Sequence, residues 1–146
     1  MKKSIKTLGL SAAMLALVLT GCADDKIVTE NDLPEEISTY ISNNFPDNEV
    51  AQVTVDQEAF SKKYAVILKD NIKLEFDSKN NITDIDANAA LPDNVIPAEI
   101  LAYVNANYPN NVITDWELED KHQQVKLDNG LTLEFSLAGE FLRIDD

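Results

Sequence analysis

The sequence predicts an α+β fold built as a tandem repeat, in which each unit is one helix packed on about four antiparallel strands. The two units are expected to form a two-unit sheet with the helices on one face. Three observations predict this fold: an internal echo of the sequence, an apolar stripe with helical spacing at the start of each copy, and an apolar–polar alternation of period two in the rest of each copy.

The internal echo consists of two blocks that recur in the same order. Residues 33–46 return as residues 96–109, with identical Pro, Glu, Ile, Tyr, Asn and Pro positions. Residues 64–76 return as residues 123–135, and the shared Leu-x-Phe pairs fall in the same places. Two blocks in one order indicate a duplication, so we place the first repeat at residues 33–88 and the second at residues 89–146.

Each copy is expected to begin with a helix. Pro34 and Pro97 suit the first turn, where the missing N–H costs nothing, and the glutamates that follow are favoured by the helix dipole. Pro46 and Pro109 are expected to end the two helices. The three-and-four spacing predicts one buried stripe on each helix, formed by Ile37, Tyr40, Ile41 and Phe45 and by Ile100, Tyr103, Val104 and Tyr108.

The segments after each helix alternate apolar and polar residues, as antiparallel strands do. In the second copy, Asp128-Asn129-Gly130 predicts a tight hairpin. An antiparallel sheet with helices on one face leaves the other face in water, and a binding function would most easily sit there. The residues expected on this free face are Lys73, Glu75, Lys126, Thr132 and Glu134.

The N-terminus has the pattern of an export signal. Lysines at positions 2, 3 and 6 precede an uncharged apolar run that is marginal for crossing a bilayer. The run ends in Leu19-Thr20-Gly21-Cys22, which looks like a lipobox. We therefore expect residues 1–21 to be a lipoprotein signal peptide and Cys22 to carry the membrane anchor, through fatty acyl chains such as palmitate. A plain secretory signal or an uncleaved anchor are the alternatives.

The residues after the cysteine are polar, and residues 22–32 are expected to form a tether. The predicted location is the bacterial cell envelope, with the lipid in the outer membrane. Acidic residues directly after a lipidated cysteine resemble a surface-export signal in some bacterial groups, so both the periplasmic and the surface-exposed face stay open.

Composition narrows the classes of partner. The formal net charge is −14, and the signal contributes lysines but no acidic residue, so the mature chain is more acidic still. Such a charge disfavours nucleic acid and anionic membrane surfaces, and it attracts cationic partners or divalent ions. With one cysteine in the chain, an intramolecular disulfide is excluded.

Catalytic groups are scarce. His122 is the one histidine and Cys22 the one cysteine, so a nucleophile beside a base, or a zinc site, has too few members. Paired-carboxylate hydrolysis would need two carboxylates in a shaped cleft. We expect no enzyme activity, and we assign no catalytic, cofactor-binding or metal-binding residue.

Calcium is the alternative ligand that an acidic chain suggests. Lys79 stands where an EF-hand loop requires an oxygen ligand, and the loop glycine is missing, so a solvated turn is the simpler interpretation. The candidate oxygen donors are residues 77–81, Asp84, Asp86, Asp145 and Asp146.

These motifs together resemble the PepSY-like, beta-lactamase-inhibitor-like family of bacterial envelope proteins, which are often small lipoproteins. The resemblance covers nearly all of residues 33–146. Its motifs are the Leu-Pro or Ile-Pro helix start, the Tyr-x-Val-x-Leu strand at residues 64–68, the hairpin at residues 128–130, the two Leu-x-Phe pairs and the Gly-x-Phe-x-x-Ile ending at residues 139–144.

This sequence departs from the family pattern in three places. Gln123 replaces the strand tyrosine, and Asn71 and Asn80-Asn81 replace turn glycines, so the departures bear on the shape of the loops and not on the fold. The resemblance implies tandem helix-plus-sheet units and mostly no established activity, and it carries over no functional residue.

Two function classes follow. The first is a non-catalytic module that binds an unidentified protein or peptide and could inhibit an enzyme. The second is an envelope domain that responds to calcium or a small ligand. An apolar or aromatic patch on the free face would favour the first class, and convergent carboxylates would favour the second.

Overall fold

The computed structural model describes residues 25–58 and 60–145. The predicted signal peptide, Cys22 and Asp146 therefore lie outside the described residues. None of the helices within the described ranges is long and apolar enough to cross a membrane.

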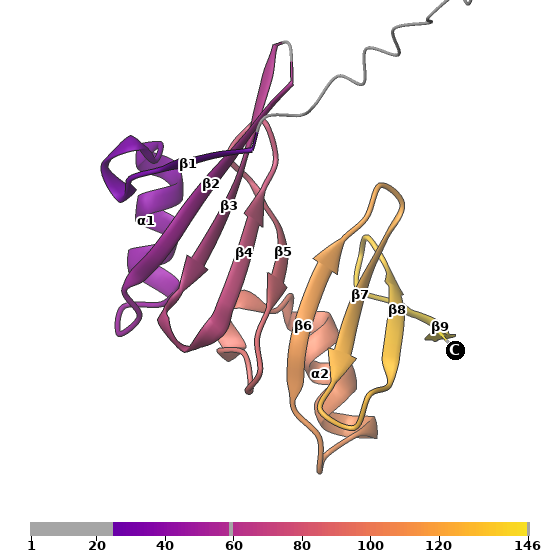
Figure 1. Cartoon of the computed structure of the whole chain (residues 1–146). Helices are drawn as coiled ribbons and strands as arrows, with labels where there is room; N and C mark the ends of the chain where they lie inside the picture. The colour runs from indigo at the N-terminus through magenta and orange to yellow at the C-terminus, as the bar shows by residue number, and fades with distance from the viewer. Residues whose placement is uncertain (1–24, 59, 146) are drawn as a thin grey trace, which may run out of the picture.

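Nine strands lie in chain order in one antiparallel sheet (Figure 1). Two α-helices and three short 3-10 helices connect them. The elements are β1 (Lys26–Val28), α1 (Glu35–Asn44), β2 (Val50–Glu58), β3 (Ser61–Leu68), β4 (Ile72–Phe76), β5 (Ile82–Asp86), α2 (Ala98–Asn107), β6 (Ile113–Leu118), β7 (His122–Leu127), β8 (Thr132–Ser136) and β9 (Phe141–Asp145), with 3-10 turns at Glu30–Asp32, Lys69–Asn71 and Asp93–Val95.

The two α-helices begin and end in the same way. Each starts directly after its proline, as the sequence predicts, and each ends where an aromatic residue leaves the helical conformation. The side-chain amide of Asn44 donates to the carbonyl of Tyr40 at 2.8 Å, and Asn107 donates to Tyr103 at 2.9 Å. The same side-chain-to-backbone hydrogen bond thus closes the last turn of both helices.

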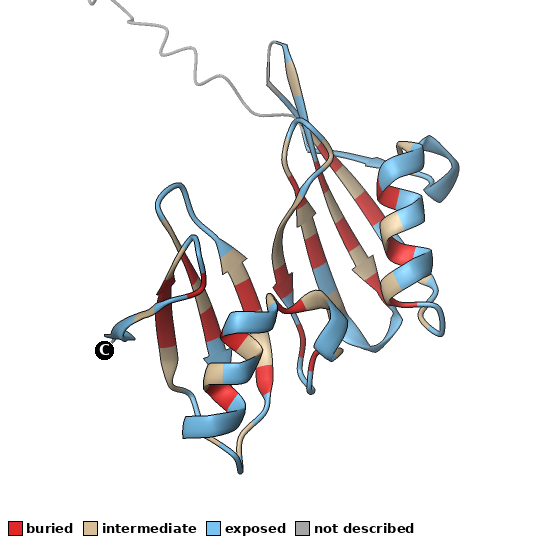
Figure 2. Cartoon of the chain, turned by 180° about the vertical axis from the view of Figure 1, so that it is seen from behind, coloured by how far each residue is buried: buried red, intermediate tan, exposed pale blue. Residues whose placement is uncertain are grey.

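Both helices cover the same face of the sheet (Figure 2). On that face one buried row crosses the sheet, because directly paired residues point to the same side. The row consists of Val53, Val66, Leu74, Ile85, Trp116, Val125 and Leu133. The helices add Ile37 and Ile100, which are fully buried, so the core is continuous from the first helix to the second.

The stripe tyrosines pack at the edge of this core. The ring of Tyr40 meets Phe76 edge-on at 5.7 Å between ring centroids, and Tyr103 meets Phe135 at 5.4 Å. Tyr103 also stacks on Phe141 of β9 at 4.6 Å. Burial raises the pKa of Tyr40 to about 12, which fits a structural role for this ring.

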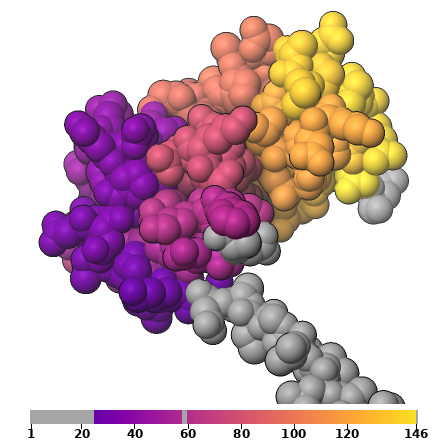
Figure 3. Space-filling view, turned by 90° about the horizontal axis from the view of Figure 1, so that it is seen from above, coloured from indigo at the N-terminus to yellow at the C-terminus, as the bar shows by residue number. Residues whose placement is uncertain are grey.

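The predicted fold class, an α+β tandem of helix-on-four-strand units forming a two-unit sheet, is wrong. Over residues 25–58 and 60–145, the chain forms a single nine-strand antiparallel sheet with two α-helices. Strand β5 pairs directly with β6, through Asp84 with Glu117, Ile85 with Trp116 and Asp86 with Asp115. Pairing satisfies the backbone groups that two separate units would leave at open edges. In the space-filling view, the magenta-to-pink residues of the first half of the chain directly adjoin the orange residues of the second half (Figure 3). A sequence pattern locates each strand but does not show which edge strands meet.

The segment expected as a tether is partly built into the sheet. Residues 26–28 form the edge strand β1, which pairs with β2, and residues 30–32 form a 3-10 turn. The boundary placed between residues 88 and 89 stays a prediction.

Two turns of the first copy keep a left-handed residue at the position where the second copy has glycine. Gly130 and Gly139 have φ angles of +88° and +85°, and Asn71 and Asn80, which stand at the corresponding places of the first copy, have +59° and +65°. Asparagine tolerates the left-handed region better than most residues. Asn71 and Asn80 therefore adopt the left-handed conformation at these turns although they are not glycines.

Candidate functional site: the open face of the sheet

The face of the sheet that the helices leave uncovered is the candidate site. We call it the open face. Strand register places one polar row across it, since the residues paired in the ladder share a side. This row consists of Thr54, Ala65, Glu75, Asp84, Glu117, Gln124, Glu134 and Arg143.

Four carboxylates meet where β5 pairs with β6. Asp84 stands directly opposite Glu117, and Asp86 stands directly opposite Asp115. We call these four residues the acidic seam. Like charges placed opposite each other on neighbouring strands repel and destabilise a sheet. The seam is therefore a feature that folding stability alone does not favour.

Burial and this repulsion together raise the pKa values of three seam residues. Burial, reinforced by the nearby carboxylates of Glu75 and Glu117, raises the pKa of Asp84 to about 6. Burial also raises the pKa of Asp115 and of Glu117 above their ordinary values. A cation placed over the seam would stabilise the ionised forms of these groups.

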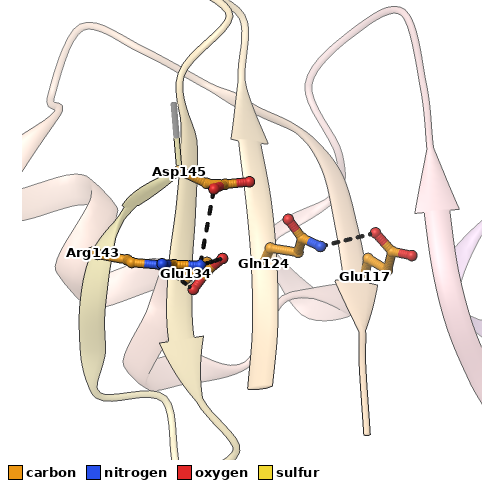
Figure 4. A network of polar contacts seen from close by, with 5 residues as sticks. All are labelled: Glu117, Gln124, Glu134, Arg143 and Asp145. Atoms are coloured by element: carbon orange, nitrogen blue, oxygen red, sulfur yellow. Dashed lines mark hydrogen bonds and ion pairs between the residues drawn. The ribbon is translucent and has the colours of Figure 1, made fainter. Parts of the chain in front are cut away.

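The seam is only partly neutralised by its own neighbours. Lys73 pairs with Glu75 at 2.5 Å on β4, and the hydrogen bond between them raises the pKa of Lys73. The hydroxyl of Thr114 donates to Asp115 at 2.5 Å. The amide of Gln124 donates to Glu117 at 3.3 Å (Figure 4).

A second polar group lies at the β8–β9 end of the open face. Arg143 donates from Nε and from a terminal nitrogen to the two carboxylate oxygens of Glu134, both at 2.7 Å (Figure 4). This fork-to-fork geometry is typical of strong arginine–carboxylate pairs. The guanidinium hydrogen bonds lower the pKa of Glu134, and Asp145 lies 4.0 Å from Arg143.

The structure places the five sequence-predicted binding residues as follows. Lys73 and Glu75 on β4 are a little under half exposed and paired with each other. Lys126 is exposed on β7, directly opposite Thr132 on one side and Asp115 on the other. Glu134 is buried beneath Arg143 and is not freely available. Their role in binding stays a prediction.

Sequence reasoning did not single out the seam as one site. The signal was present in two short segments, Asp84-Ile85-Asp86 and Asp115-Trp116-Glu117, which both alternate acidic and apolar residues. That pattern places the acids on the open face. Only the pairing of β5 with β6 brings the two segments together.

The candidate calcium residues are dispersed. Asp77 accepts hydrogen bonds from the backbone of Lys79 and Asn81 and from the Asn81 side chain, so it caps its own turn. Asp84 and Asp86 belong to the seam. In the part of the chain that the structure describes, three or more His, Cys, Asp or Glu side chains nowhere converge as a metal-binding group.

His122 opens β7 opposite Ser136 of β8. Its neighbour Gln123, which replaces the tyrosine of the first copy, is buried and structural. Its amide accepts from the indole of Trp116 at 3.1 Å and donates to the carbonyls of Ser136 and Leu137 at 3.3 and 3.1 Å.

Comparison with known proteins identifies a family. A family model described as "Putative beta-lactamase-inhibitor-like, PepSY-like" matches residues 19–84 and again residues 62–143. The two matches together cover most of the chain and confirm the resemblance seen in the sequence. No curated protein matches the chain.

Solved structures of periplasmic proteins from Bacteroides share the fold. One, described as a putative periplasmic protein of the DUF2874 family from Bacteroides vulgatus, is 36% identical with a TM-score of 0.79 and covers 86% of this chain and all of its own. A second, described as a putative calcium-regulated periplasmic protein from Bacteroides thetaiotaomicron, is 33% identical with a TM-score of 0.79 and the same coverage. A third, from Bacteroides vulgatus and described as of unknown function, is 33% identical with a TM-score of 0.77, and it covers 84% of this chain and 99% of its own.

Proposed function

Because this chain belongs to the PepSY-like, beta-lactamase-inhibitor-like family, we propose that it is a non-catalytic envelope lipoprotein whose open face binds a basic segment of a partner protein or peptide. Its periplasmic relatives support the envelope location. The lipid anchor on Cys22 and the outer membrane belong to the proposal and rest on the lipobox-like sequence.

The acidic seam is the observation that carries this proposal. Two carboxylate pairs face each other across neighbouring strands, and the pKa of Asp84 rises to about 6. A lysine or arginine side chain of a partner would replace this repulsion with charge-assisted hydrogen bonds. Binding would therefore relieve the repulsion between carboxylates that destabilises the free protein.

The lysines beside the seam would influence which partners bind. Lys73 and Lys126 border the carboxylates on either side, through β4 and β7. Charged residues at the border of an interface tune encounter rate and selectivity more than affinity. A uniformly basic partner would be attracted by the seam and repelled at its border, so its charges must match the pattern.

Calcium response is the second candidate. It is favoured by one relative with 33% identity, which is described as calcium-regulated. The two candidates are separated by calorimetry with calcium chloride as the probe. Calcium binding that disappears when the seam is neutralised would favour the ion. The basic-partner proposal expects no such heat.

The direct test is calorimetric titration of the mature domain with a lysine-rich peptide. Neutralising the seam should weaken binding about tenfold or more, since each lost charge-assisted contact contributes on the order of 1.4 kcal/mol or more. The seam variant carries D84N, D86N, D115N and E117Q.

A control variant with the same change in net charge separates the site from general attraction. It neutralises four exposed carboxylates away from the open face: E35Q, D47N, D93N and D120N. The control should bind the peptide almost as the wild type does. Equal weakening in both variants would show that net charge alone attracts the peptide, and would overturn the proposed site.

A further inference from the structure

We propose that the free end of the β2–β3 hairpin contacts the surface of the lipid bilayer beside the anchor. This inference rests on the proposed lipid on Cys22. We call the projecting part the ribbon, meaning residues 56–58 and 60–63, on the two sides of the turn.

The ribbon has no strand on either side of it among the described residues. Its ladder pairs are Asp56 with Lys63, Gln57 with Lys62, and Glu58 with Ser61. Pairing of β1 with β2 stops at Val55, and pairing of β3 with β4 stops at Tyr64. A two-stranded ribbon with open edges is marginally stable in water alone. This geometry suits a segment that is supported by a surface outside the domain.

Phe60 gives the ribbon an apolar end. Its side chain is fully exposed, whereas Phe45, Phe76 and Phe135 are each at most 2% exposed. Lys62 follows it on β3, and Lys26 lies beside the base of the ribbon on β1. Lysine can lay its apolar stem along a membrane while its ammonium stays at the headgroups. An exposed aromatic side chain with a lysine close to it fits the interfacial layer of a bilayer.

The course of the chain brings the anchor to this end of the molecule. Lys26 pairs with Val55, and β1 runs antiparallel to β2, so the chain before Lys26 leaves toward the ribbon. Cys22 and Lys26 are four residues apart, a separation that an extended chain spans in at most about 14 Å. From Val55 to the end of β2 the strand rises about 10 Å. An anchor on Cys22 would thus be within reach of the same surface as the end of the ribbon, and Figure 3 shows the described residues from this end of the molecule.

The charge of the ribbon suits an uncharged surface better than an anionic one. Within the ribbon, Lys62 and Lys63 are balanced by two acidic residues, Asp56 and Glu58. This end is therefore neutral in a strongly acidic protein, and insertion of Phe60 would supply the attraction. Tethering makes the contact intramolecular, so weak insertion suffices.

The test uses the full lipidated chain in vesicles of phosphatidylcholine and phosphatidylethanolamine. Phe60→Cys is labelled with an environment-sensitive fluorophore, since the lipid occupies the thiol of Cys22. We expect a blue-shifted emission that brominated lipid quenches. The matched control is Asn110→Cys, in the turn before β6 at the other end of the strands, which should emit as in water.

Because the label is itself apolar, a second pair of variants keeps the native side chain. Both variants carry the label at Lys62→Cys; one keeps Phe60 and the other also carries Phe60→Ser. The serine should markedly reduce quenching of the label by brominated lipid. Equal quenching in the two would overturn the role of Phe60.

The remaining outcomes separate the ribbon from the anchor. Water-like emission at position 60 in protein that floats with the vesicles would overturn the ribbon contact and leave the anchor standing. A blue shift without quenching by lipid would indicate a protein contact and also overturn it. Protein that fails to float, as Cys22→Ser should, would overturn the anchor and the ribbon contact with it.

Discussion

The pKa of Asp84 depends on its burial and on the neighbouring carboxylates of the open face. Its pKa of about 6 lies above the ordinary 3.8, because the side chain is partly buried and faces Glu75 and Glu117. Between these two values the folded protein holds a proton that the unfolded chain has released. The folded state therefore gains stability from this group as the pH falls through about 6, and loses it as the pH rises.

We predict that Asp84→Asn raises the melting temperature, with a larger gain at about pH 7.5 than at about pH 5. The amide removes a charge that is unfavourable only when ionised. Thermal unfolding at both pH values measures the difference, with Asp120→Asn in an exposed turn as the control. An equal gain at both pH values would mean that the pKa of Asp84 is not raised in the folded protein.

At the scale of the strands, β4 and β8 hold equivalent core positions. Leu74 on β4 and Leu133 on β8 are both fully buried. Leu74→Ala and Leu133→Ala should each lower the free energy of unfolding by about 2 to 5 kcal/mol, through lost burial and a cavity. Urea denaturation measures this, with Lys126→Ala on the open face as the control. An unchanged midpoint for either leucine variant would contradict its inward assignment.

The two turn glycines are predicted to differ in their tolerance of a side chain. A Cβ at Gly139 would lie 2.6 Å from the Cβ of Glu99 on α2, whereas a Cβ at Gly130 meets nothing within 4 Å. Gly130→Ala should cost about 1 to 2 kcal/mol, from the left-handed backbone alone. Gly139→Ala should cost clearly more, because the helix itself must move.

Asparagine variants separate the two causes. Gly130→Asn should be better tolerated than Gly130→Ala, as Asn71 adopts this conformation in the first copy, while Gly139→Asn should still collide with Glu99. Equal costs at the two positions, measured by urea denaturation, would refute the predicted contact between the β8–β9 turn and α2.

Local patterns were sufficient to locate most elements. Pro34 and Pro97 preceded the helices, and the period of two gave the inward and outward residues of β3, β4, β7 and β8. They were insufficient where contacts are distant in the sequence. The pairing of β5 with β6 joins strands separated by a helix, and the cover of Arg143 over Glu134 depends on side-chain placement rather than on alternation.

For the whole molecule, the continuous sheet creates the acidic seam, which two separate units would lack. It brings Asp84 and Asp86 of the first copy against Asp115 and Glu117 of the second, so the seam exists only in the joined fold. The helices cover one face, and the proposed anchor and ribbon would fix one end toward the membrane. The sheet would then stand upright on the bilayer, and a partner could reach the open face from the side.

The most direct test of the proposed binding site is to map the binding surface by nuclear magnetic resonance. The mature domain labelled with nitrogen-15 is titrated with the lysine-rich peptide, and backbone amide shifts are followed residue by residue. We expect the largest, saturating shifts in β5 and β6 around the four seam residues, and their loss in the seam variant. Shifts confined to α1, α2 or the turns, with β5 and β6 unchanged, would contradict binding at the seam.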